Sequence, residues 1–271
     1  MVKKILSNGF LILVLAFMYA PILFVIVYSF SGNSRFVFDQ GFTFASYVDI
    51  FTSSKTPALL DAIKNTFIIA IASSVISTIM GTFAAIGIYY MKKRTKKIIN
   101  NVNQLPITNS EIVMAISLLL FFNTLGFSEG YLRLILAHVA FCTPYVVLSV
   151  MPKLVQLDPN VYEAALDLGA TPTRALFTVM VPMIAPGILS GFVMAFTISM
   201  DDFIITQINK GATTGINTLG TYIYSDAGKH GLEPFWLAIF SIIIVLVVAI
   251  LLGFNLWKTK KAAEALRMKT V

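Results

Sequence analysis

The sequence predicts an all-α, polytopic membrane protein with six transmembrane helices. Of its 271 residues, 57% are hydrophobic and only 12% are charged, whereas soluble domains average about 45–50% apolar and about 25% charged residues. The mean hydropathy of +0.83 points the same way. The apolar residues gather in runs long enough to cross a hydrocarbon core of about 30 Å. We therefore expect a single transmembrane domain over residues 1–271 and no soluble domain.

Six apolar runs define the expected spans. The first carries no charge from Gly9 to Phe30 and follows Lys3 and Lys4. A cleaved signal peptide is the alternative, but this run exceeds the usual apolar region of about 7–15 residues and no clear A-x-A site follows it. Residues 31–65 are mixed and polar, and we expect an external loop there. The expected spans are residues 9–30, 66–90, 105–127, 132–151, 183–206 and 235–257, with a kink at Pro144 in the fourth.

Small residues mark two of these spans as packing elements. The second span is rich in Ser, Thr, Gly and Ala, and the basic run of residues 92–97 ends it. On the fifth span, Gly187, Gly191, Ala195 and Ser199 recur every four residues. Such a face lets another backbone approach closely. The sequence leaves open whether this face packs against another helix or lines a pore.

The distribution of basic residues predicts the orientation. Most Lys and Arg residues lie in the two termini, in residues 92–104 and in residues 152–182. With six spans, these segments share one side. The positive-inside rule places that side in the cytoplasm, so the net charge of +7 reflects orientation in the lipid bilayer and not nucleic-acid binding.

The loop of residues 152–182 is polar but carries helix signals. Asp158-Pro159 can cap and begin a helix. Gly169 can end it in the left-handed conformation. Thr171-Pro172 repeats the start signal, so a second short helix should run from Pro172 to about Val181. We expect a compact pair of helices that docks a soluble partner.

Three carboxylates lie within or beside the spans. Acidic residues in a span usually face a partner or a wet cavity. Asp201 and Asp202 lie roughly 27 Å along the fifth helix from Met183, near its outer end. Glu111 lies near the inner end of the third span. The structural alternatives are that Asp201 and Asp202 form an interfacial pair outside the apolar core, and that Glu111 is stabilised by the dipole of a helix N-terminus.

The sequence contains no recognisable enzyme motif. A Walker A pattern is absent, so the chain itself should bind no ATP, and we expect no cofactor and no metal. His138 and His230 are too isolated for a metal site, and the single Cys142 forms no internal disulfide. An intramembrane aspartyl protease is the alternative from a different class, but adjacent Asp201 and Asp202 lie about 100° apart on a helix and cannot face one point. A proton-coupled transporter is a third possibility.

The polar loop resembles the EAA loop of importer-type ABC permeases. The resemblance rests on Glu163-Ala164-Ala165, on Asp167-Leu168-Gly169-Ala170, and on Val181-Pro182 with Pro186-Gly187-Ile188. It implies that these residues couple the chain to a cytoplasmic ATPase subunit. It also implies that ATP and Mg²⁺ are bound by that partner.

A further resemblance extends over nearly the whole chain, to PotC-type permeases of spermidine/putrescine importers. It is carried by residues 110–118, 141–144 and 196–202. It implies the type I ABC importer fold, a paralogous permease subunit, two ATPase subunits, an extracytoplasmic polyamine-binding protein and a bacterial inner-membrane location. For a polycationic cargo, Asp201 and Asp202 would form an outer electrostatic station and Glu111, where the family often has Asp, a later one. A permease for another small solute, such as an anion, is the alternative, which the acidic residues disfavour.

Overall fold

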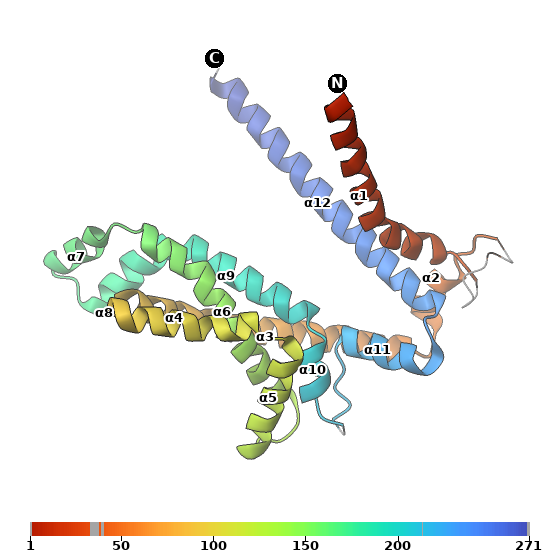
Figure 1. The fold of residues 1–271 in the computed structure, drawn as a ribbon, viewed down its shortest axis with the longest axis horizontal. Coiled ribbons are helices and arrows are strands. Elements are labelled where there is room, and N and C mark those ends of the chain that lie inside the picture. The colour runs from red at the N-terminus through yellow and green to blue at the C-terminus, as the bar shows by residue number, and fades with distance from the viewer. Residues whose placement is uncertain (1, 33–37, 39–40, 213, 270–271) are drawn as a thin grey trace. The chain divides into compact units, whose positions relative to one another are not determined.

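The computed structural model describes residues 2–32, 38, 41–212 and 214–269 (Figure 1). Every regular element in that part of the chain is a helix, which confirms the all-α fold. The helices are α1 (Val2–Tyr28), α2 (Ala45–Thr52), α3 (Thr56–Tyr90), α4 (Lys93–Thr108), α5 (Glu111–Thr124), α6 (Tyr131–Gln156), α7 (Pro159–Asp167), α8 (Pro172–Ala175), the π-helix η1 (Leu176–Met180), α9 (Val181–Asp201), α10 (Ile204–Asn209), α11 (Leu219–His230) and α12 (Pro234–Lys269).

The chain divides into two compact units. The first unit joins Met1–Pro57 to Ile223–Val271, and the second is Ala58–Tyr222. In the first unit, the Tyr47 hydroxyl on α2 lies 2.7 Å from Ser29 Oγ and donates to Ser241 Oγ over 3.2 Å. These bonds connect α2 with the end of α1 and with α12, and Figure 1 shows α1 and α12 meeting beside α2.

The core of the second unit is the pairing of α6 with α9. A Cβ at Gly191 would lie 3.1 Å from Val146 Cγ1, and a Cβ at Gly187 would lie 2.8 Å from Lys153 Cγ. Only glycine permits so close an approach. The small residues of α9 are therefore a packing seam against α6, and the buried members are Gly187, Gly191, Ala195 and Ser199.

Four described helices are long and apolar enough to cross a membrane, and a bent pair gives up to five. The four are Asn8–Tyr28, Thr56–Tyr90, Tyr131–Gln156 and the run Pro172–Asp201. The apolar part of α12, Pro234–Ala249, is shorter. This pattern is compatible with the six expected spans, whose full number stays a prediction.

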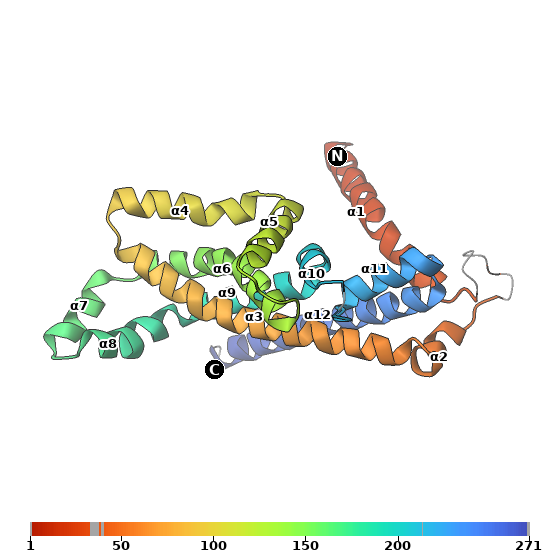
Figure 2. The ribbon, with the colours of Figure 1, turned by 90° about the horizontal axis from the view of Figure 1, so that it is seen from below.

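The third expected span is not one helix. A bend of 106° separates α4 from α5 (Figure 2), because Asn109 and Ser110 are extended, with ψ of 155° and 135°. Asn and Ser compete with helical backbone bonds through their own side chains, so they favour helix ends. Pro106, expected to open the span, lies inside α4.

Two other boundaries also differ from the sequence expectation. Residues 31–65 are not wholly loop, since they contain α2 and the start of α3, with Pro57 in its first turn. Nor does the second loop helix end near Val181. It continues through η1 into α9, which ends at Asp201 and not at residue 206. The π-helical segment keeps the chain helical next to Pro182, which has no N–H to donate. Arg35 and the side chains of Lys3, Lys4 and the basic tail lie outside the described residues.

Candidate functional site

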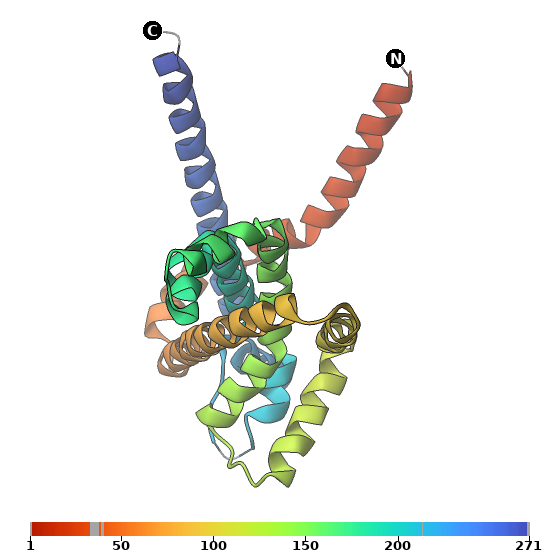
Figure 3. The same ribbon diagram turned by 90° about the vertical axis from the view of Figure 1, so that its left-hand side faces the viewer.

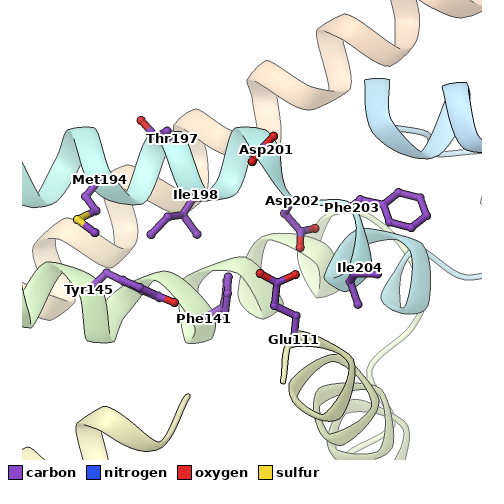
Figure 4. A pocket seen from close by; sticks show the side chains of 10 residues that line it. All are labelled: Glu111, Phe141, Tyr145, Met194, Thr197, Ile198, Asp201, Asp202, Phe203 and Ile204. Carbon is purple, nitrogen blue, oxygen red and sulfur yellow. The ribbon is translucent and has the colours of Figure 1, made fainter. Parts of the chain in front are cut away.

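A pocket of about 410 Å³ lies where α5, α6 and α9 meet the turn into α10 (Figure 4). It brings together all three carboxylates singled out from the sequence. Its lining residues are Glu111, Phe141, Tyr145, Met194, Thr197, Ile198, Asp201, Asp202, Phe203 and Ile204.

Glu111 reaches this pocket because the third span is broken. It is the first residue of α5, directly after the bend, where the positive end of the helix dipole favours a carboxylate. Its side chain is exposed. A continuous helix would have placed it far from Asp201 and Asp202. The expectation of two stations at opposite ends is therefore wrong, since all three carboxylates line one pocket.

Asp202 is held by backbone and side-chain donors at the start of α10. Its Oδ1 accepts from Ile205 N over 3.1 Å, and its Oδ2 accepts from Thr206 N and from the Thr206 hydroxyl, both over 2.9 Å. Its side chain is only 2% exposed. Asp202 thus satisfies the free N–H groups of a helix start while its carboxylate borders the pocket.

Asp201 and Asp202 diverge from one another. Asp201 is the last residue of α9 and is exposed, whereas the backbone of Asp202 is extended, with ψ of 132°. In Figure 4 the Asp202 carboxylate points toward that of Glu111, and Asp201 points to the other side of the ribbon. Because the helix ends between them, these two adjacent acidic side chains lie in different environments.

A buried histidine lies directly behind Asp202, and sequence reasoning missed its importance. His138 of α6 is fully buried. Its Nε2 lies 3.0 Å from Thr206 Oγ1 and 3.5 Å from Asp202 Oδ2, and its Nδ1 lies 2.8 Å from Ser199 Oγ. The sequence showed only an isolated histidine, because its partners lie about sixty residues away along the chain. Among the described residues, no group of three or more His, Cys, Asp and Glu could hold a metal ion.

Aromatic rings form a second wall of the pocket. Phe141 and Tyr145 are one turn apart on α6, with ring centroids 5.7 Å apart and planes at 71°. Aromatic faces attract cations, so carboxylates and rings together suit an organic ammonium ion. The spacing of four residues, which places both rings on one face of a helix, was the signal that could have identified this wall.

Among the described residues, no hydrogen bond joins Asp202 to a second carboxyl group, as an aspartyl dyad would require. Both oxygens accept bonds from Ile205 or Thr206. An acid dyad needs one proton shared between two facing carboxyls. The arrangement favours binding of a cation over acid–base catalysis.

In the loop of residues 152–182, the helix caps and the left-handed glycine form as the sequence predicts, whereas the second helix continues into α9 (Figure 3, green to blue-green, facing the viewer). Asp158 accepts from Asn160 N over 3.0 Å and caps α7. Gly169 has φ of +85°, and the Ala170 N–H bonds to Ala165 O over 3.1 Å, which closes the helix end. Glu163 is exposed and Leu168 is 89% exposed. These exposed side chains are available for a docking contact.

Comparison with known proteins identifies relatives over nearly the whole chain. Residues 77–258 match the family described as binding-protein-dependent transport system inner membrane component. The chain is 33% identical to the spermidine/putrescine transport system permease protein PotC of Escherichia coli (strain K12), covering 94% of this chain and 95% of that one. It is 31% identical to the putrescine transport system permease protein PotI of the same organism, covering 96% and 92%.

Solved structures share the fold at low sequence identity. One is a chain of a bacterial ABC transporter involved in the import of the acidic polysaccharide alginate, with a TM-score of 0.69, 12% identity, and coverage of 95% of this chain and 96% of that chain. Another is a chain of the MetNI methionine ABC transporter, with a TM-score of 0.56, 18% identity, and coverage of 73% and 92%. At these identities the likeness concerns the fold alone.

Proposed function

The chain belongs to the family of inner-membrane components of binding-protein-dependent transport systems, and on that premise we propose that it is the transmembrane permease subunit of an ATP-driven importer of spermidine- or putrescine-type polyamines. PotC and PotI, which each cover more than nine-tenths of this chain, are polyamine permeases by name.

The observation that carries this proposal is the composition of the pocket. Three carboxylates and three aromatic rings line it, and none of its described lining residues is Lys or Arg. A polyamine is a thin chain of ammonium groups separated by methylene segments. Carboxylates would bind the ammonium groups through charge-assisted hydrogen bonds, while Phe141 and Tyr145 would cover the methylene segments and attract the charge.

The three carboxylates differ in exposure, and we assign them different roles accordingly. Glu111 is exposed and would contact the cargo on the side that Asp202 faces. Asp201 is also exposed, and because it points to the other side of the ribbon, it would contact the cargo from a different direction. Asp202 is held by Ile205 and Thr206, so it would supply negative potential and one wall of the site. A site of few, partly solvated carboxylates also suits a transporter, because the cargo must leave again.

Coupling to ATP would pass through the loop of residues 152–182. We assign the docking contact to the segments Glu163–Ala165 and Asp167–Ala170, which carry the EAA resemblance. The chain would work with a paralogous permease, two ATPase subunits that bind ATP and Mg²⁺, and an extracytoplasmic polyamine-binding protein. Both termini and the loop would lie in the cytoplasm, on the inner side of a bacterial inner membrane.

Polyamine uptake by the reconstituted complex tests the proposal. Replacing one contacting carboxylate by its amide removes a charge-assisted contact of about 1.5–3 kcal/mol, or roughly a tenfold to hundredfold loss of apparent affinity. We expect this loss in Glu111→Gln and Asp201→Asn, and reduced uptake in Asp202→Asn. Asp61→Asn, an exposed acid of α3 outside the pocket, is the matched control.

Two results would contradict the proposal. If all three amide variants take up polyamine like the unmodified complex, the carboxylates are structural and the path lies elsewhere. If the complex transports an anionic solute and not a polyamine, the importer assignment stands but the substrate is wrong. Uptake is measured at several substrate concentrations and normalised to assembled complex.

A further inference from the structure

We propose that His138 is a positioning residue for the cation pocket, and that it acts by fixing the Asp202 carboxylate through Thr206. The proposal rests on the proposed function for its readout. Its geometric basis is a chain of hydrogen bonds that runs behind the pocket through α3, α6, α9 and α10.

The direction of the bonds next to Asp202 can be assigned. The Thr206 hydroxyl donates its single hydrogen to Asp202 Oδ2 over 2.9 Å. Its oxygen is then free to accept, and His138 Nε2 lies 3.0 Å away. Nε2 therefore carries a hydrogen and donates to Thr206. The same nitrogen lies 3.5 Å from Asp202 Oδ2, so the imidazole polarises the carboxylate both directly and through the hydroxyl.

The other ring nitrogen ties the same group to the packing seam. His138 Nδ1 lies 2.8 Å from Ser199 Oγ, which lies 2.9 Å from Ser73 Oγ on α3. With the hydrogen on Nε2, Nδ1 accepts from the Ser199 hydroxyl, and the single hydrogen of Ser73 goes either to Ser199 Oγ or to Ile69 O, 2.7 Å away. Since Ser199 is in the last turn of α9, the imidazole bridges both sides of the break between α9 and α10.

Because the members of this chain are buried, loss of one hydrogen bond destabilises the arrangement. His138, Ser73 and Thr206 are fully buried, and Ser199 is 4% exposed. A buried polar group that loses its partner has no water to replace it. Loss of the imidazole would leave the Thr206 hydroxyl without its donor and free to turn away from Asp202 Oδ2, so that Asp202 would keep only its bonds to the N–H groups of Ile205 and Thr206. His138 touches no cargo, because it is not among the pocket-lining residues, so its effect must pass through Asp202.

Two amide substitutions test the roles of the two imidazole nitrogens separately. Gln places its amide nitrogen near the Nε2 position and can still donate to Thr206, whereas Asn places it near Nδ1 and reaches Ser199 only. We expect His138→Gln to keep the apparent KM for polyamine uptake within threefold of the unmodified complex. We expect His138→Asn and His138→Leu to raise it at least tenfold. Cys142→Ala, one turn further along α6 and equally buried, is the control for packing on the same face.

A double-substitution cycle with Asp202→Asn shows whether the effect passes through Asp202. If His138 acts by positioning Asp202, His138→Leu combined with Asp202→Asn should raise KM no more than Asp202→Asn alone, because coupled sites are not additive. If His138 had only a structural role, the KM increases of His138→Leu and Asp202→Asn would multiply in the double variant. Thr206→Val removes the linking hydroxyl at similar shape and should match His138→Leu, and it decides the question if His138→Leu fails to assemble.

The outcomes are distinguishable. Multiplying effects, or equal KM values for His138→Gln and His138→Asn, would overturn the positioning role while the cation pocket stands. If Asp202→Asn alone leaves uptake unchanged, the proposed role of Asp202 in the pocket fails first, and the positioning role fails with it.

Discussion

At the scale of single residues, the chain uses adjacent acids for different purposes. Asp201 and Asp202 differ by one position, yet one side chain is exposed and the other is 2% exposed and bonded to Ile205 and Thr206. The end of α9 causes this difference, because the extended backbone at Asp202 turns its carboxylate toward the N–H groups of α10. A substitution at either position therefore has to be interpreted through its own contacts.

A second cluster of charges, in the first unit, makes a prediction about stability. Lys55 Nζ lies 2.7 Å from both Asp226 Oδ2 and Glu233 Oε2, and Trp236 Nε1 donates to Asp226 Oδ2 over 2.7 Å. Partial burial alone would lower the pKa of Lys55, but the two carboxylates outweigh it and raise this pKa above its ordinary value of 10.5. Burial would raise the pKa of Asp226, but Lys55 and Trp236 outweigh it and hold this pKa below 3.8.

We expect Lys55→Met to destabilise the assembled complex by about 1–3 kcal/mol. The raised pKa of Lys55 gives stability that is complete below pH 10.5 and is lost as the pH rises through the folded value. The lowered pKa of Asp226 gives stability that is present above pH 3.8 and is lost as the pH falls through the folded value. The difference in thermal midpoint should therefore stay constant between about pH 5 and pH 9. Lys64→Met, an exposed lysine of α3, is the control, and a difference that disappears within this window would argue against the ion pairs.

At the scale of elements, local signals in the sequence predicted local structure well. The caps at Asp158 and Thr171 and the left-handed Gly169 are all present, because each depends on side-chain bonds or backbone freedom within a few residues. The small-residue face of α9 was also visible in the sequence, since spacing by four fixes one side of a helix, but its choice between a packing seam and a pore lining was left open.

Features that depend on distant parts of the chain were not predictable in the same way. The expected third span, residues 105–127, crosses the bend between α4 and α5. The polar residues 108–111 interrupt it for only one turn, which is too short a signal to specify a bend from hydropathy alone. The bend decides that Glu111 lies in the same pocket as Asp202. The bonds of His138 to Ser199 and Thr206 likewise require the pairing of α6 with α9 and α10, which periodicity within one helix does not specify.

The left-handed glycine at the end of α7 gives a prediction about coupling. No atom lies within 4 Å of a Cβ built at Gly169, so a side chain there meets no neighbour and is opposed by the backbone alone. A β-branched residue at φ of +85° is strained by roughly 1–2 kcal/mol or more. We expect Gly169→Val to distort the end of α7, so that the complex still assembles and hydrolyses ATP while polyamine uptake falls at least fivefold.

The ratio of uptake to ATP hydrolysis in proteoliposomes measures this effect. Gly87→Ala is the matched control, because Gly87 lies within α3, has no atom within 4 Å of a built Cβ and has an ordinary helical conformation. An unchanged ratio in Gly169→Val would remove the coupling role from this turn.

At the scale of the whole molecule, orientation in the membrane connects the sequence to the proposed mechanism. The EAA segment can reach an ATPase only if it lies in the cytoplasm, where ATP is available. The basic run of residues 92–97 and the loop of residues 152–182 should then lie on one side of the membrane, and the segment that precedes α3 on the other. The charge distribution predicts this orientation, and the EAA resemblance implies it separately.

Cysteine labelling tests the orientation with little background, because the native Cys142 is completely buried. We expect a membrane-impermeant thiol reagent to label Ser54→Cys in intact cells, and to label Thr95→Cys and Leu168→Cys only after the membrane is opened. All three positions are exposed. Ser54 is preferable to its neighbour Lys55, whose ion pairs a substitution would break. Labelling of Leu168→Cys in intact cells would place the loop outside, beyond the reach of a cytoplasmic ATPase, and the proposed coupling would be physically impossible. Labelling of all three in intact cells would instead indicate a leaky membrane. In sealed inverted vesicles, the expected orientation gives the opposite pattern, with Thr95→Cys and Leu168→Cys labelled and Ser54→Cys protected.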